Sequence, residues 1–522
     1  MNAPSVKNSE SKLQIRGSLL LLSGKILALF LNLLTQVLTV RYLVKADYGA
    51  FAFAVSAVEL ASCFSMLGLN KACARFVAIY HERNDFERTL GTLAMLVATV
   101  CGASIACVIA VVAGQQLLLD YVVSDQLSLT LLLILIALAP LDAIDFVLEA
   151  FFGAFGNVRV VFFRRHILGP LLKLLAVVVV LMLQGRVELL AGCYLAAGLL
   201  GFSFYIPALI RLIRHEGLWD YARRGRLRYP FGEVTRFSVP LLGSHLVFLC
   251  QGAVVVLLLE MWSGSAEVAE YRAVFPFARL CSVVSIAFSL LFTPMAARLL
   301  MRGQTAQLSQ LYWNSVTWTT LLAFPLFALT SVYSTPLSVF MLGTEYAGAG
   351  SVMAVLAVGF FLETTLGLSG QTLRVYARVR LVVLADLIAT VCGLTLMVWL
   401  IPRYGAWGAG MANGAFMITE QLLYMVFTHM ATDVRTFSRD GIWVYASVAV
   451  GTAGLFVLQH FLQWGLIVSA VPVVLVTVGL LVAHRRRLAI GSVYPGIAQI
   501  RWIGPWLAAE PTSSPDTAGR LP

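Results

Sequence analysis

The sequence predicts an all-α polytopic membrane protein with about 14 transmembrane helices, arranged as two pseudo-symmetric six-helix lobes plus two C-terminal helices. Three observations predict this fold. The 522 residues are 60% hydrophobic and only 12% charged, whereas soluble domains carry about 25% charged residues. Fourteen apolar runs of about 20 residues follow one another, and each is long enough to cross a bilayer. Short motifs also recur between the two halves of the chain.

The expected spans follow the chain in order, each an apolar run between polar breaks. They cover residues 17–40, 48–69, 90–113, 128–150, 165–184, 189–210, 238–260, 270–293, 311–334, 348–370, 381–401, 408–430, 442–462 and 465–483. With their short connections they fill almost the whole chain, so no soluble catalytic domain fits. The eight cysteines show no CxxC pair and no histidine at ligand spacing, which argues against a disulfide framework or a zinc site.

Lysine and arginine indicate the orientation of the spans, because they are enriched in cytoplasmic loops. With the N-terminus placed inside, 29 of the 37 basic residues fall on the inner side, five on the outer side and three at membrane depth. The outer residues are Arg41, Lys45, Arg186, Arg272 and Arg403, and those at membrane depth are Lys25, Lys173 and Arg279. Both termini are therefore expected to be cytoplasmic, and the net charge of +11 needs no nucleic-acid partner.

An internal repeat relates spans one to six to spans seven to twelve. LEAFFGAFGN at residues 148–157 matches LETTLGLSGQ at 362–371, and two shorter matches occur at similar offsets. Because six is even, both copies share one orientation, as in transporters whose halves rock about a midplane site. The expected domains are an N-terminal lobe at residues 1–211, a linker and C-terminal lobe at 212–431, and the last two spans with a cytoplasmic tail at 432–522.

Cations inside the membrane are the first candidates for function, because each costs roughly 2.5–3.5 kcal/mol at the bilayer centre and needs a cavity or a partner. Lys25, Asn32 and Gln36 share one face of the first span with two hydroxyl residues. Arg279 shares a face of the eighth span with three other hydroxyl residues, and His245 aligns with Lys25 in the repeat. A cation beside hydroxyls and amides suits an anionic, hydroxyl-rich ligand such as a phosphorylated sugar.

These cations also have a structural interpretation. Lys25 and Arg279 could pair with Glu59 or Glu260 and hold helices together. His245 could be a neutral histidine bonded to a neighbouring helix.

Acidic residues at membrane depth are candidates for ion coupling. Asp142, Asp145 and Glu149 line one face of the fourth span behind Pro140, which predicts a kink. Three neighbouring carboxylates cannot all ionise at low cost, so proton or sodium coupling is expected there and no other cofactor. Compensation by Lys173 and Arg159 is the alternative. A looser acidic set in the second lobe comprises Asp386, Glu420 and Glu363 with Asn413.

Four segments carry a family resemblance: RGSLLLLSGK at residues 16–25, YLVKADYG at 42–49, LGLNKACARF at 67–76 and LGTEY at 342–346. They resemble the bacterial polysaccharide-biosynthesis flippases, which export O-antigen and exopolysaccharide repeat units and belong to the multidrug/oligosaccharidyl-lipid/polysaccharide exporter superfamily. The resemblance covers nearly the whole chain. It implies a cationic central cavity lined by the first two helices of each lobe, which here hold Lys25, Glu59, His245 and Arg279.

The resemblance implies a transporter and not an enzyme. Its expected function is to flip a polyprenyl-diphosphate-linked oligosaccharide from the cytoplasmic to the periplasmic leaflet of the bacterial inner membrane by alternating access. The expected substrate-binding residues are Lys25, Arg279, His245, Asn32, Gln36 and Glu59. Besides the lipid-linked oligosaccharide, the expected partners are membrane lipids and the polysaccharide polymerase and export machinery.

Two other functions stay open at this point. An ion-coupled multidrug antiporter of the same superfamily would need an acidic, aromatic-lined cavity. A membrane glycan polymerase would need a longer outer loop than the sequence provides.

Overall fold

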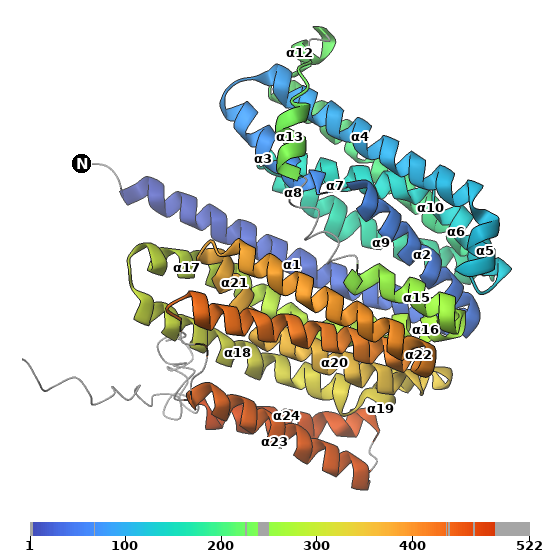
Figure 1. Ribbon diagram of the computed structural model, residues 1–522, viewed down its shortest axis with the longest axis vertical. Coiled ribbons are helices and arrows are strands. Elements are labelled where there is room, and N and C mark those ends of the chain that lie inside the picture. Colours follow the sequence, from blue (N-terminus) through green and yellow to red (C-terminus); the bar gives the residue numbers. More distant parts are fainter. Residues whose placement is uncertain are drawn as a thin grey trace, which may run out of the picture. The chain divides into compact units, whose positions relative to one another are not determined.

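The computed structural model describes residues 4–66, 68–224, 227–238, 250–434, 436, 439–462 and 465–485. The described residues are mostly helical, and Figure 1 labels most of the α-helices. They form two compact units. Unit 1 comprises residues 1–277, 338–356 and 383–416, and unit 2 comprises residues 278–337, 357–382 and 417–522.

Unit 1 contains all of the expected first lobe. Its helices are α1 (Pro4–Tyr42), α2 (Lys45–Met66), α3 (Leu69–Glu82), α4 (Phe86–Ala113), α5 (Gln115–Tyr121), α6 (Gln126–Leu135), α7 (Leu138–Ala154), α8 (Val158–Phe162), the π-helix η1 (Phe163–Leu168), α9 (Gly169–Leu183), α10 (Val187–Ser203), α11 (Tyr205–His215), α12 (Trp219–Arg224), α13 (Phe231–Ser238), the π-helix η3 (Cys250–Val254), α15 (Val255–Ser263), most of α16 (Ser265–Ala278) and the 3-10 helix η5 (Thr344–Tyr346).

Unit 2 contains the 3-10 helix η4 (Arg279–Cys281), α17 (Ser282–Met301), α18 (Thr305–Ser331), α21 (Leu368–Val375), α23 (Arg439–Leu462) and α24 (Leu466–Ala483). Besides α16, whose last residue belongs to unit 2, the units share α19 (Ser334–Leu342), α20 (Ala349–Leu366) and α22 (Val379–Ala431). Both units are built from more than one stretch of the chain, and the expected lobes at residues 1–211 and 212–431 stay a prediction.

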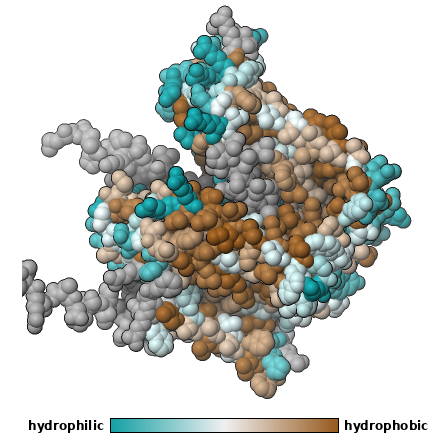
Figure 2. All heavy atoms as spheres, viewed as in Figure 1, coloured by the Kyte–Doolittle hydropathy of each residue, from teal (hydrophilic) through white to brown (hydrophobic). Residues whose placement is uncertain are grey.

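Nine helices of the described chain are long and apolar enough to cross a membrane, or 11 if each of two bent pairs is one span. The predicted all-helical polytopic fold is thus confirmed, and the count of fourteen stays a prediction. Expected spans eleven and twelve form the single 53-residue helix α22, which kinks at Gly405. Two shorter apolar helices lie where spans seven and fourteen are expected. Apolar residues cover much of the helix surfaces, and hydrophilic residues gather near helix ends (Figure 2).

The predicted kink beside Pro140 is present. Helices α6 and α7 are bent by 42° at a short break that includes Ile136. A proline ring clashes with the carbonyl of the residue four positions earlier, and for Pro140 that residue is Ile136. The break then places the acidic face of α7 at a different angle from the start of the span.

Each unit has an apolar core of its own. In unit 1, Leu96, Val147 and Phe151 are buried in a cluster that joins α3, α4 and α7. In unit 2, Phe292 and Tyr312 pack α17 against α18. These cores hold the helices that carry the polar side chains described next.

Candidate functional site

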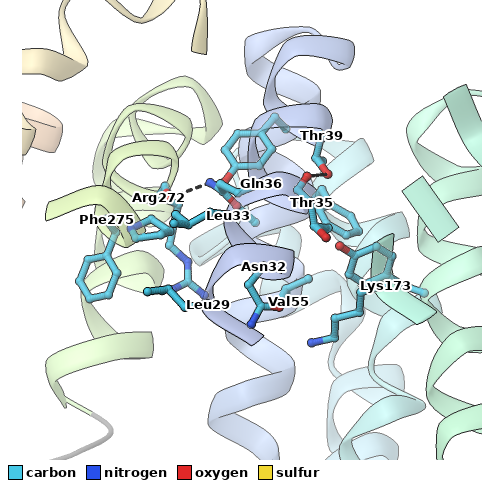
Figure 3. Close-up of a pocket in the computed structure, with 15 residues that line it drawn as sticks. Leu29, Asn32, Leu33, Thr35, Gln36, Thr39, Val55, Lys173, Arg272 and Phe275 are labelled. Carbon is cyan, nitrogen blue, oxygen red and sulfur yellow. Dashed lines mark hydrogen bonds between the residues drawn. The ribbon is translucent and has the colours of Figure 1, made fainter. Parts of the chain in front are cut away.

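The described chain has a polar pocket in unit 1, built mainly by α1, α2 and α16, which we call the α1–α16 pocket (Figure 3). Its volume is about 230 Å³. It is lined by Leu29, Asn32, Leu33, Thr35, Gln36, Thr39, Tyr48, Phe51, Ala52, Val55, Lys173, Tyr194, Arg272, Phe275 and Pro276. The lining combines two cations with amides, hydroxyls and aromatic rings, and none of these 15 residues is acidic.

The polar side of the pocket is the stripe that the sequence predicts on the first span. Asn32, Gln36 and Thr39 recur at steps of four and three residues, which brings them to one face of α1. The Thr39 hydroxyl donates to the Thr35 carbonyl at 2.7 Å. Its one proton is therefore used, and the hydroxyl oxygen can only accept hydrogen bonds from other groups.

Gln36 connects three helices around the pocket. Its Nε2 donates to the Tyr48 hydroxyl on α2 at 2.6 Å and to the Arg272 carbonyl on α16 at 3.2 Å. Both amide protons are thus used within the protein. These bonds hold the α16 backbone at Arg272 against α1, and the expected contact of Gln36 with a substrate stays a prediction.

The two cations of the pocket come from α9 and α16. The Arg272 side chain is 18% exposed, and its Nη2 donates to the Glu59 carboxylate at 3.2 Å. Glu59 is 54% exposed and engages only one of the five N–H donors that a guanidinium carries. In the view of Figure 3 the Asn32 amide lies between the charged ends of Arg272 and Lys173.

The remaining predicted binding residues lie elsewhere. Lys25 is exposed on α1 and does not line the pocket. Arg279 is exposed in unit 2, where the Glu363 carboxylate attracts it electrostatically. His245 lies outside the described residues. Glu59 and Glu260, the alternative partners expected for Lys25 and Arg279, contact other residues. Glu59 pairs with Arg272, and Glu260 accepts hydrogen bonds from serine hydroxyls.

Sequence reasoning missed Arg272 as a pocket residue, and it placed Lys173 at membrane depth without including it among the substrate-binding residues. Arg272 was expected on the outer side because it stands near the end of its span. The available signal was that both cations lie inside predicted apolar runs, at 165–184 and 270–293, where an uncompensated charge is costly.

Two of the three carboxylates on α7 form ion pairs. Arg164 Nη2 lies 2.6 Å from Asp145, and Arg165 Nη1 lies 2.8 Å from Glu149. Both arginines come from η1, whose wider turn interrupts the helical register between α8 and α9. Asp142 is attracted electrostatically by Lys173. The compensation expected from Arg159 and Lys173 is thus provided mainly by Arg164 and Arg165.

The second acidic set is divided between the two units. Asp386 is buried in unit 1. Glu420 is buried in unit 2 and accepts a weak hydrogen bond from the Tyr424 hydroxyl at 3.5 Å. Asn413 donates to the Tyr271 hydroxyl at 2.6 Å.

Polar contacts around the α1–α2 turn join segments that are more than 220 residues apart, and we call them the polar seal. Lys45 Nζ lies 2.5 Å from Glu270 of α16. Arg41 donates to the carbonyls of Phe340 and Met341. Helix α2 also approaches α16 so closely that a methyl group at Gly49 would lie 1.7 Å from the Ser265 carbonyl oxygen. The seal therefore ties the start of the first repeat to segments of the second within unit 1.

Comparison with known proteins gives a family and a fold. The family described as "Polysaccharide biosynthesis protein" matches residues 15–300, more than half of the chain. No match was found among curated proteins. The fold is similar to that of the lipid II flippase MurJ in an inward closed conformation, with a TM-score of 0.71 and 12% identity over 90% of this chain and 99% of that one.

Multidrug transporters share the fold as well. An inward-facing multidrug resistance MATE family transporter of the MOP superfamily has a TM-score of 0.64 and 13% identity, over 77% of this chain and 94% of that one. A MOP superfamily transporter from Pyrococcus furiosus, described as having a binding pocket of reverse polarity, has a TM-score of 0.53 and 14% identity, over 80% and 94%. At these identities the likeness concerns the fold alone.

Proposed function

The chain belongs to the polysaccharide biosynthesis protein family, and we propose that it flips a polyprenyl-diphosphate-linked oligosaccharide from the cytoplasmic to the periplasmic leaflet of a bacterial inner membrane. Movement occurs by alternating access, with both termini cytoplasmic and no catalytic step. The observation that carries the proposal is the lining of the α1–α16 pocket, which holds Arg272 and Lys173 and no carboxylate. The MurJ-like fold supports the same class of lipid-linked substrate.

The two cations suit a diphosphate in different ways. The planar fork of Arg272 can hold two phosphate oxygens at once, whereas Lys173 supplies a compact point charge. Asn32 adds an amide between them. The pocket of about 230 Å³ is smaller than the roughly 300–1,000 Å³ of pockets that enclose drug-sized ligands. It therefore holds the diphosphate group, and the glycan and the lipid lie outside it.

Ion coupling belongs to the proposal through Asp142. Asp145 and Glu149 are paired with arginines, whereas Asp142 interacts with the pocket cation Lys173. A proton or cation on Asp142 would release Lys173 to the diphosphate, which links ion binding to substrate binding. Asp386 and Glu420 are secondary candidates.

The competing function is a multidrug antiporter, which the MATE-like fold favours. Recognition of cationic drugs requires negative charge in the cavity, and the lining described above carries positive charge. The pocket therefore favours an anionic ligand over a cationic drug.

The experiment is complementation of a strain that lacks the protein, with Lys173→Gln and Arg272→Gln combined in one variant. We expect lipid-linked oligosaccharide to accumulate and glycan export to stop, at normal abundance of the protein in the membrane. The matched control is Arg186→Gln, which removes an exposed arginine outside the pocket. Normal export by the double variant would contradict the proposal, and resistance to cationic drugs on overexpression would favour the antiporter.

A further inference from the structure

We propose that Glu260, Asp125 and three serines form a binding site for a sodium ion next to the polar seal. The site lies where the N-terminal end of α6 meets the end of α15 and the start of α16. It is separate from the α1–α16 pocket and from the carboxylates of α7.

Glu260 is the centre of the site. It is only 1% exposed. Its Oε1 accepts hydrogen bonds from the hydroxyls of Ser124 at 2.6 Å, Ser265 at 2.9 Å and Ser128 at 3.1 Å. Three hydroxyl oxygens, two from residues 124–128 and one from the start of α16, thus converge on one carboxylate oxygen.

Asp125 brings a second carboxylate to the same hydroxyls. Its Oδ1 caps α6 by accepting from the Ser128 amide at 2.6 Å, and its Oδ2 lies 3.2 Å from the Ser265 hydroxyl. That hydroxyl also lies 3.2 Å from Ser124 Oγ and 3.1 Å from Ser128 Oγ. A serine hydroxyl carries a single proton, so the three hydroxyls can donate in only three of these six oxygen–oxygen contacts, and the other three bring lone pairs together. Such a group of hard oxygens is suited to a cation.

The second oxygen of Glu260 makes none of these contacts. Glu260 Oε2 is buried and has no hydrogen-bond partner within the described part of the chain. A buried carboxylate without compensation is costly. A proton on Oε2 would leave an O–H group without an acceptor, and a proton on Oε1 would compete with the three serine donors. A bound cation satisfies the carboxylate and the hydroxyl lone pairs together.

The charge of the site favours a monovalent ion. Asp125 is only partly buried and is already stabilised as the cap of α6, so Glu260 contributes the one fully buried charge. Three of the five ligand residues are neutral hydroxyls. Asp47 of α2 lies within electrostatic range of Asp125, which adds to the attraction for a cation. We therefore assign sodium and not a divalent ion.

Sodium at this site would stabilise the arrangement in which the two repeats meet. Ser124, Asp125 and Ser128 belong to the first repeat, and Glu260 and Ser265 to the second. An ion that needs ligands from both binds only while they are together, so its binding favours that state.

The test is sodium binding by the purified full-length protein in lipid nanodiscs, measured with radioactive sodium and by thermal unfolding at constant ionic strength with choline as the replacement ion. We expect saturable binding and a Tm that rises with sodium. Glu260→Gln and the milder Ser124→Ala should each weaken binding by at least about tenfold. The control is Glu267→Gln on α16, whose carboxylate accepts from the Ala406 amide outside the site and which should bind sodium normally.

Several results would overturn the assignment. These are sodium binding that is unchanged in both Glu260→Gln and Ser124→Ala, stabilisation by calcium but not by sodium, and stabilisation that depends on pH alone. Because this readout requires no lipid-linked substrate, its failure is distinguishable from failure of the proposed flippase activity.

Discussion

Reversing one charge of the Lys45–Glu270 pair should open the polar seal. The two side chains are 26% and 19% exposed, so the pair is partly shielded from water. Exposed pairs contribute about 0.2–1 kcal/mol, and breaking a buried pair costs about 3–5 kcal/mol. We expect about 1–3 kcal/mol here, which changes the ratio of sealed to open protein by about 5- to 150-fold.

The assay is a distance measurement between spin labels on Val44 and Phe340, which are both exposed beside the seal, in a variant without its native cysteines. Lys45→Glu and Glu270→Lys should each shift the distance distribution to longer values. The combined variant restores opposite charges and should return the distribution toward that of the starting protein. If the single variants leave the distances unchanged, or the combined variant stays as open as they are, the ion pair does not hold the seal.

Three further substitutions test the pocket and the packing around it. Arg272→Gln should weaken binding of a polyprenyl diphosphate by about 10- to 150-fold, the equivalent of about 1.5–3 kcal/mol for a charged hydrogen bond. Glu59→Gln should bind the diphosphate at least as well as the starting protein does. Equal losses of affinity in a binding titration would mean that the Arg272–Glu59 pair is only structural. Gly49→Val should lower the Tm of the purified protein because α16 leaves no space for a side chain, and Gly102→Val, which faces open space, should leave it unchanged. Burial and the Glu233 carboxylate of α13 raise the pKa of Tyr80 to about 12. The contribution of Tyr80 to stability is therefore complete below pH 10 and is lost as the pH rises through 12. Hydrogen exchange of α13 should show this pH dependence, and Tyr80→Phe should abolish it.

The sequence predicted the membrane-spanning architecture well, for a physical reason. A bilayer requires apolar runs of about 20 residues and satisfies backbone groups only within helices, so hydropathy gives the element type directly. The bend before Pro140 was predictable because proline has a local steric effect. The packing units were not, because segments 338–356 and 383–416 join unit 1 through contacts with residues far away in the sequence.

The pocket was predictable only on one of its helices. The spacing of Asn32, Gln36 and Thr39 depends on α1 alone, so periodicity was sufficient. Arg272 and Lys173 come from other helices, and which of several membrane cations faces a given helix is a tertiary property. The pairing of Glu59 with Arg272 instead of Lys25 also depends on how the helices pack, which the periodicity of one helix does not give.

The position of Lys25 gives the proposed pathway a direction. Seven residues separate it from Asn32, so it lies on the same face of α1 about 10 Å closer to the N-terminus. Lys25 is exposed, whereas Arg272 is mostly buried at the pocket. A phosphate group held at Asn32 is therefore about two turns of α1 from the Lys25 backbone. We propose that a diphosphate entering from the cytoplasmic side, where the basic residues are expected to place the N-terminus, meets Lys25 before it reaches Asn32, Lys173 and Arg272. In this proposal Lys25 serves capture and the pocket cations serve retention.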